Sequence, residues 1–253
     1  MRPSTETIQV VPHSLQSLNT AVDGRIARGD YLGALELPRA LAARDADTMS
    51  ALLVEINLAE AEYNLGRWSD AWDRLRGLDP LAAAFPIARA GLSQQRAWIA
   101  AHTGRAGEAL RHWHRAELGD LPRHYHAEHF FTGAVAQIAA GELDAAQRCA
   151  RTGERATVRA SSRRNALAIC GRVAAAMGEW TEAERLFRAA AQHPHRGQGG
   201  DAMLLWGDVL VRLGRSAEAR QAYALAVERD PQSESAQLAR VRSQGILVSL
   251  PPR

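Results

Sequence analysis

The stretch from Trp206 to Ala226 reads WGDVLVRLGRSAEARQAYALA, and it holds the pattern that decides the fold. Apolar residues recur at helical spacing on both sides of Gly214. Before the glycine they are Trp206, Leu210 and Leu213, and after it they are Ala219, Tyr223 and Ala226. Glycine ends helices because it accepts a left-handed backbone without a Cβ clash. The stretch therefore predicts two amphipathic helices joined by a tight turn.

The same pattern returns along the chain with a period of 36 to 38 residues. The glycines with this spacing are Gly29, Gly66, Gly104, Gly141, Gly178 and Gly214. Five residues after each of them comes an alanine, at Ala34, Ala71, Ala109, Ala146, Ala183 and Ala219. A small side chain at this point lets the second helix pack closely against the first. The period predicts an array of helix–turn–helix repeats rather than one globular core.

Three copies of the repeat resemble the tetratricopeptide repeat (TPR) family. The fullest copy is Trp206-Gly207, Leu210, Leu213-Gly214, Ala219, Tyr223, Ala226 and Pro231. The others are Cys170-Gly171, Met177-Gly178, Trp180, Ala183, Phe187, Ala190 and Pro194, and then Ala59, Leu65-Gly66, Trp68, Ala71 and Pro80. The resemblance covers roughly residues 15 to 233. It implies an all-α, right-handed solenoid of about six TPR-like repeats, at about 15–48, 52–85, 90–123, 127–160, 164–197 and 200–233.

The ends of the array and its turns carry further expectations. We expect an extended tail over residues 1–14, a capping helix over 234–243 and a second extended tail over 244–253. Pro38 should shorten the second helix of the first repeat. The expected N-caps of second helices are Ser69, Thr181 and Ser216, with Thr181 and Glu184 forming a capping box.

Composition excludes several classes of function. The sequence contains no lysine, which excludes Schiff-base chemistry and phosphate-loop lysines. The formal charge of +3 is small, so bulk charge does not indicate a nucleic-acid partner. No run approaches the roughly 20 apolar residues of a membrane span, and the start lacks the apolar core of a signal peptide. We therefore expect a cytoplasmic protein without a membrane partner.

No motif points to catalysis, a cofactor or a metal. His112, His114, His124, His126 and His129 lie close together in the sequence, but they form no HExxH motif. The thiols of Cys149 and Cys170 are expected on inward helix faces, where nothing would activate them. We therefore predict that the protein is not an enzyme and binds neither a metal nor a cofactor.

The concave surface of the array is the predicted binding site, since repeat proteins bind extended or helical segments there. The repeat register places ten residues on or near it: Asn57, Glu60, Tyr63, Gln94, Trp98, His102, Phe131, Arg172, Asp208 and Arg212. Tyr63, Trp98 and Phe131 would form an aromatic middle, and a charged flank would follow. The pattern predicts a non-catalytic scaffold or adaptor that binds a peptide through one or two apolar anchors.

Other readings of this surface stay open. Trp98 could instead fill space between the second and fourth repeats. The apolar tail residues 246–250 could occupy the groove of their own chain or of a second copy, giving a homo-oligomer. The acidic-tail clamp of chaperone-binding TPR proteins is rejected. At its positions this chain has Asn19, Asp23, Asn57, Gly91 and Gln95, of which only Asn57 agrees.

The second helices suggest an alternative function on the opposite side. Basic residues recur there at equivalent positions: Arg76, Arg111, His114, Arg148, Arg151, Arg185 and Arg188. In the TPR family these positions face outward, so the residues would form a basic ridge. Such a ridge could bind nucleic acid or an acidic protein. It could equally be a solvated surface with local acidic partners.

Overall fold

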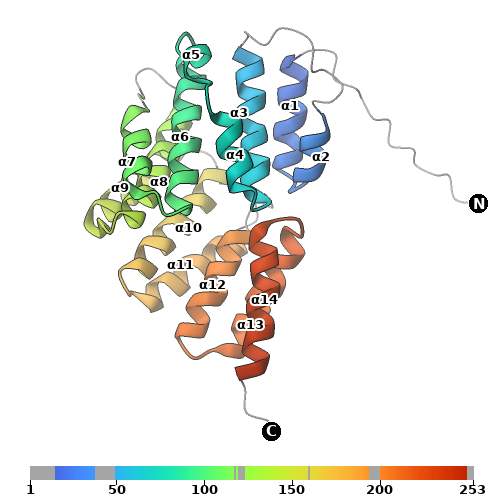
Figure 1. Cartoon of the computed structure of the whole chain (residues 1–253). Coiled ribbons are helices and arrows are strands. Elements are labelled where there is room, and N and C mark those ends of the chain that lie inside the picture. The colour runs from blue at the N-terminus through green and yellow to red at the C-terminus, as the bar shows by residue number, and fades with distance from the viewer. Residues whose placement is uncertain are drawn as a thin grey trace, which may run out of the picture.

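The computed structural model describes residues 15–37, 49–116, 118, 123–158, 160–193 and 200–249. Within these ranges all regular structure is helical, which confirms the all-α prediction (Figure 1). No helix in them is both long and apolar enough to cross a membrane. The expected N-terminal tail and Pro38 lie outside the described residues.

Six helix pairs follow one another along the chain. They are α1 (Leu15–Ile26) with α2 (Tyr31–Glu36), α3 (Met49–Asn64) with α4 (Trp68–Leu75), α6 (Pro86–His102) with α7 (Ala106–Arg115), α8 (Arg123–Ala139) with α9 (Leu143–Ala156), α10 (Ala160–Ala176) with α11 (Trp180–Gln192), and α12 (Gly200–Arg212) with α13 (Ser216–Arg229). A further helix, α14 (Glu234–Ser249), packs against the last pair. Each first helix contacts the first helix of the next pair, which makes the array a solenoid.

The turn inside each pair is built around its glycine. All six predicted glycines have positive φ angles, between 74° and 79°. In the second pair, Gly66 N–H donates to the carbonyl of Tyr63, and Arg67 N–H donates to that of Glu62. This is the Schellman motif. The carbonyl of Arg67 then accepts from Ala71 N–H in the first turn of α4. Arg67 therefore both completes the end of the first helix and begins the second.

The predicted side-chain caps are wrong for a reason that follows from this turn. The N-cap positions of α4, α11 and α13 are held by Arg67, Glu179 and Arg215, and none of them makes a side-chain cap. Because the residue after the glycine is already the N-cap, Ser69, Thr181 and Ser216 lie inside their helices. Among the six glycine turns, only the one before α2 has a side-chain cap: Asp30 Oδ1 accepts from Gly33 N–H at 3.1 Å.

A second glycine position lets the two helices of a pair approach closely. Gly171 in α10 faces the ring of Phe187 in α11, and Gly207 in α12 faces the ring of Tyr223 in α13. A methyl group at Gly207 would lie 2.3 Å from Cε1 of Tyr223. Both aromatic rings are buried, so they have little room to move. These positions therefore require glycine.

Two elements differ from the expectation. A one-turn helix, α5 (Asp79–Ala82), lies between the second and third pairs, where the glycine pattern gives no sign of it. Arg96 of α6 holds it by donating to Asp79 at 2.8 Å. The expected extended tail 244–253 is wrong up to Ser249, because α14 continues as a helix through Gly245 to that residue. A single glycine weakens a helix without ending it.

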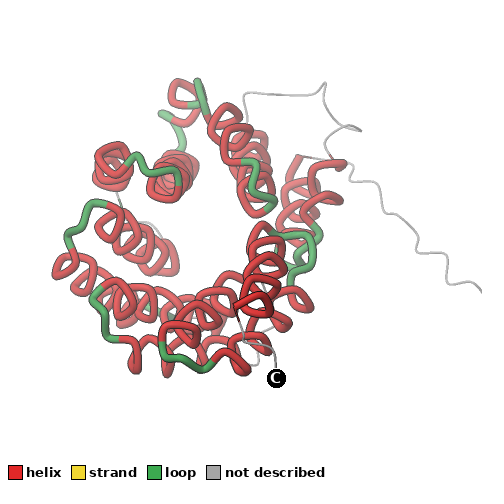
Figure 2. Tube along the Cα trace, turned by 60° about the horizontal axis from the view of Figure 1, so that its bottom comes forward, coloured by secondary structure: helices red, strands yellow, loops and turns green. Residues whose placement is uncertain are grey.

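The solenoid bends until its two ends meet. Figure 2 shows the helices running round a central opening, and Figure 1 shows the C-terminal helix α14 below the N-terminal helices. The Tyr31 hydroxyl donates to Asp230 Oδ2 at 2.7 Å, and Trp68 Nε1 donates to both Glu234 carboxylate oxygens at 3.1 Å. Leu32 N–H donates to Gln232 Oε1 at 3.1 Å. The array is therefore closed by a few side-chain hydrogen bonds rather than by a helix–helix interface.

The closing contact contains a buried carboxyl group. Asp230 is 4% exposed, and its Oδ1 has no hydrogen-bond partner within the described structure. Burial raises the pKa of Asp230 to about 6; nearby Asp201 adds to this, whereas the bond from Tyr31 and the charge of Arg164 oppose it. The folded protein therefore favours the neutral carboxyl group.

Replacing Gly207 by alanine tests the close approach of the helices. We expect Gly207→Ala to lower the free energy of unfolding by about 2 kcal/mol, because the methyl group would overlap the Tyr223 ring. Gly107→Ala is the control, since Gly107 also lies in a helix and a methyl group there would meet nothing within 4 Å. That variant should be neutral or more stable by up to about 1 kcal/mol. Urea unfolding followed by circular dichroism measures both, and equal effects would contradict the packing argument.

The carboxyl group of Asp230 makes a prediction about pH. A pKa raised from 3.8 to about 6 gives stability that is complete below pH 4 and is lost as the pH rises through 6. Asp230→Asn keeps a neutral acceptor for Tyr31 and removes the titration. Between pH 4 and pH 7.5 the wild type should therefore lose about 2.5 kcal/mol relative to the variant. Urea unfolding of both proteins at the two pH values measures this, and parallel pH dependence would contradict it.

Candidate functional site

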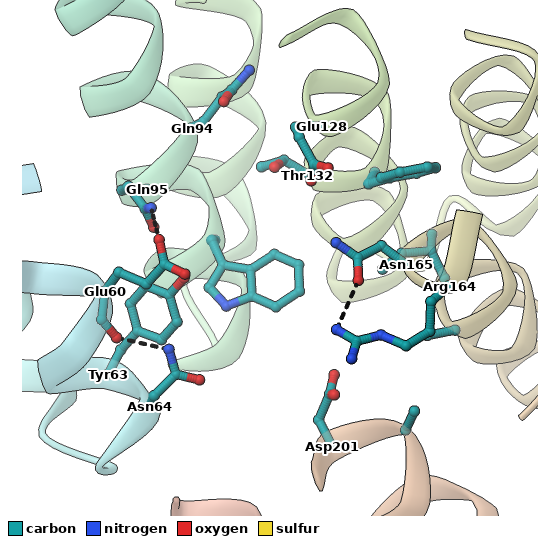
Figure 3. Close-up of a pocket in the computed structure, with 15 residues that line it drawn as sticks. Glu60, Tyr63, Asn64, Gln94, Gln95, Glu128, Thr132, Arg164, Asn165 and Asp201 are labelled. Atoms are coloured by element: carbon teal, nitrogen blue, oxygen red, sulfur yellow. Dashed lines mark hydrogen bonds between the residues drawn. The ribbon is translucent and has the colours of Figure 1, made fainter. Parts of the chain in front are cut away.

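The first helices of five successive pairs surround a cavity of about 360 Å³, which we call the lumen. They are α3, α6, α8, α10 and α12. Five of the ten residues predicted for the concave surface line it: Glu60, Tyr63, Gln94, Trp98 and Phe131. Figure 3 shows Glu60, Tyr63 and Asn64 on one wall, with Arg164 and Asn165 on the opposite wall.

The other five predicted residues lie in different places. His102 and Arg172 adjoin the lumen, and they contact each other at 3.2 Å. Asn57 donates to Asn19 at 3.0 Å between α3 and α1. Asp208 accepts from Tyr223 at 2.8 Å and also pairs with Arg242 of α14. Arg212 lies over the Trp180 ring, 5.8 Å from its centre. The structure therefore does not bring Asn57, Asp208 and Arg212 into the lumen.

The aromatic middle is smaller than predicted. Phe131 is only 2% exposed and belongs to the apolar core between α8 and its neighbours. Tyr63 and Trp98 are half-buried and line the lumen. Trp98 also packs against the core that contains Phe131. It therefore both lines the lumen and fills space between repeats. Two aromatic side chains, rather than three, offer an accessible face to a ligand.

A stack of rings continues from the lumen to the closing contact. Tyr63 stacks on Trp68 with ring centres 5.6 Å apart, and Trp68 stacks on His102 at 5.3 Å. His102 in turn lies 4.5 Å from the Trp98 ring. Since Trp68 also donates to Glu234, the rings link one wall of the lumen to the C-terminal helix.

Charged groups of α10 and α12 meet on the other side. Arg172 donates to Asp201 at 3.2 Å, and in Figure 3 the guanidinium of Arg164 points toward the same carboxylate. Burial would raise the pKa of Asp201, but Arg172 and Arg164 lower it overall. Burial and Arg172 also lower the pKa of His102 to about 4. At neutral pH Asp201 is therefore ionised and His102 is neutral.

Amide side chains fill much of the remaining wall. Gln95 donates to the Glu60 carboxylate at 3.2 Å, and Asn64 donates to the Glu60 carbonyl at 2.8 Å. Gln94 donates to the carbonyl of Tyr125 at 3.4 Å, and Asn165 accepts from Arg164 at 3.4 Å. Amides carry both donors and acceptors, which is what the backbone of an extended peptide needs.

Ten lining residues were not predicted: Asn64, Gln95, Glu128, Thr132, Arg164, Asn165, Ala168, Ile169, Asp201 and Ala202. Counted back from the glycine of each pair, the lining takes positions 2 to 6 in α3, 6 to 10 in α6, 9 to 13 in α8, 9 to 14 in α10, and 12 and 13 in α12. The lumen thus crosses the first helices obliquely. A prediction that uses one fixed position in every repeat goes wrong toward the C-terminus. This drift explains why Asp208 and Arg212 lie outside the lumen.

The predicted basic ridge lies on the second helices, and its members are exposed. Four of them have an acidic partner three or four residues earlier in the sequence: Arg76 with Asp73, Arg111 with Glu108, Arg185 with Glu182 and Arg188 with Glu184. The pair between Arg185 and Glu182 is short, at 2.6 Å. His114, Arg148 and Arg151 complete the set. Local acids therefore reduce the charge that the ridge presents.

The residues considered for catalysis or metal binding lie in unreactive surroundings. Burial raises the pKa of Cys149 and raises that of Cys170 to about 11, so both thiols stay protonated at neutral pH. Burial lowers the pKa of His129 to about 4, and its ring stacks on Trp113 at 5.4 Å. Within the described residues, no three histidine, cysteine or acidic side chains gather as metal ligands would.

Comparisons with known proteins agree with this architecture. A sequence profile of the tetratricopeptide repeat matches residues 201–233. A thermophilic TPR protein of Thermus thermophilus superposes with a TM-score of 0.60 at 21% identity, over 78% of this chain and 99% of that one. A Rap protein complexed with Competence and Sporulation Factor gives 0.58 at 12%, over 86% and 77%. PilW, a widely conserved type IV pilus biogenesis factor, gives 0.56 at 15%, over 89% and 98%.

At these identities the superpositions establish the fold and nothing finer. Curated protein sequences give no significant match to the chain.

Proposed function

We propose that this tetratricopeptide-repeat protein is a non-catalytic interaction scaffold that binds an extended segment of a partner protein in its lumen. The observation that carries the proposal is the lumen itself, where the half-buried Trp98 and Tyr63 lie among amide side chains from three helices. Aromatic anchors in a sheltered pocket are the usual centres of binding energy, since they offer large area at small entropic cost. The Rap protein, which shares the fold, is known in a complex with Competence and Sporulation Factor.

The size of the lumen favours an extended segment over a helix. One helical turn rises 5.4 Å, and with its side chains it is about 10 Å across, so it fills about 400 Å³. The lumen holds about 360 Å³ within a closed ring of helices. One helical turn with its side chains would already exceed this volume, whereas a few extended residues fit.

The other surfaces support a binding function less well. The basic ridge is open to solvent, and four of its seven members are matched by acids three or four residues earlier in the sequence. The chain's own tail was a competing occupant of the groove, but α14 keeps that segment helical to Ser249. A helical tail supports an extended ligand from another protein better than an extended tail of the chain itself.

Removal of the Trp98 side chain tests the proposal. Peptides would be selected from a random linear display library on the wild-type protein, and their affinities measured by fluorescence anisotropy. We expect Trp98→Ala to weaken binding by about 2 kcal/mol, which is about 30-fold. Trp180→Ala is the matched control, because Trp180 is a partly exposed tryptophan on α11 outside the lumen.

The control should bind like the wild type, and both variants should keep the wild-type helical content. A library that yields no binder contradicts the proposal. So does an affinity that Trp98→Ala leaves unchanged, or one that both variants lower equally.

A further inference from the structure

We propose that the lumen selects a cationic side chain, arginine or lysine, on the segment that it binds. The proposal rests on the function proposed above and adds the chemistry of the ligand. It is carried by an acidic excess in the lining, by the two aromatic faces there, and by the way in which the chain's own arginine occupies the edge of the site.

The charge of the lumen is opposite to that of the chain. Its lining contains three carboxylates, Glu60 of α3, Glu128 of α8 and Asp201 of α12. Among the described lining residues one side chain is cationic, Arg164 of α10, so the formal charge of the lining is −2, whereas the whole chain carries +3. Arg172, which lies outside the lining, also donates to Asp201, and the other two carboxylates belong to the α3 and α8 walls.

The electrostatic surroundings of Tyr63 agree with this count. Its pKa is raised well above the usual value, first by burial and then by the charge of Glu60, with a smaller contribution from Glu128. Both carboxylates therefore act on the same point of the lumen. A charge inside an enclosed site interacts more strongly than one at an exposed surface, because less water screens it.

The neighbouring aromatic rings suit a cation. The faces of tryptophan and tyrosine attract guanidinium and ammonium groups. The chain already uses this interaction at the edge of the lumen, where Arg172 lies over the Trp98 ring, 5.6 Å from its centre, and donates to Asp201. A guanidinium held between an indole and a carboxylate is thus a geometry that this site accepts.

The same charges oppose the binding of anionic segments. Neutral His102 gives no positive charge at the edge of the lumen, Arg172 is engaged with Asp201, and Arg164 donates to Asn165. An acidic side chain would also have to approach Glu60 or Glu128. Like charges brought together in a sheltered site oppose binding, so the lumen discriminates against acidic segments as well as favouring basic ones.

The test uses three pools of random octapeptides, acetylated and amidated at their ends, that differ at one central position. That position is arginine or lysine in the first pool, glutamine in the second, and aspartate or glutamate in the third. Binding to the full chain is measured by isothermal titration calorimetry at low salt and in about 0.3 M salt, where dissolved ions screen charges at the protein surface more strongly. We expect the basic pool to bind at least about tenfold more tightly than the glutamine pool, and the acidic pool most weakly.

Glu60→Gln and Glu128→Gln should each reduce the preference for the basic pool at least about threefold, and the double variant should abolish it. Glu228→Gln, a change of the same kind on the exposed surface of α13, should leave the preference intact. Thermal melting checks that each variant is folded. If one of the lumen variants unfolds, the other variant and the ranking of the three pools by the wild-type protein still test the proposal.

The outcomes separate the two proposals. Equal binding of the three pools, lost in Trp98→Ala, overturns the charge preference and keeps lumen binding. Preference for the acidic pool overturns it too. No binding of any pool overturns the proposed function together with the preference.

Discussion

The architecture depends on one backbone constraint, the left-handed glycine that ends the first helix of each pair. The residue after it completes the hydrogen bonds of one helix and begins the next, so no free residue separates the two helices. Because the same turn recurs six times with φ angles within 5° of one another, the pairs have similar geometry. Similar pairs stack with a regular rotation, which here carries the array round until the first residue of α14 meets the first residue of α4. The lumen exists only because that rotation nearly completes a circle.

This constraint explains which features the sequence could predict. The glycine and alanine periods locate the helix pairs, and Gly171 and Gly207 belong to the same repeat signature because aromatic rings lie against them. The caps could not be predicted by residue type alone. A serine or threonine two or three residues after the glycine has the right chemistry for an N-cap, but the residue directly after the glycine already holds that position in the Schellman turn. The short helix α5 and the length of α14 depend on local contacts that carry no period.

The candidate site could be predicted only in its first half. Glu60, Tyr63, Gln94 and Trp98 are near the start of the array, where the repeat register and the lumen still coincide. Farther along, the lumen crosses each helix closer to its N-terminus, so Asn165 and Asp201 replace Arg172 and Asp208 as lining residues. The missing information is the oblique path of the superhelix, which is a property of the stacked array and of no single repeat. The meeting of acidic groups from α3, α8 and α12 is equally a product of that path.

The contact between the two ends has a consequence for the number of repeats. Tyr31 and Asp230 are 199 residues apart in sequence, and Trp68 and Glu234 are 166 apart. In an open array each repeat contacts only its neighbours, so a copy can be added or lost at little cost. Here the ends meet only after a fixed total rotation. An added helix pair would carry Asp230 past Tyr31, and so would a change in the angle between the two helices of one pair. Either change would leave the carboxyl group of Asp230 without its hydrogen-bond donor. Copy number and curvature are thereby tied together, and the protein can lengthen by duplication only if it gives up the closed circle.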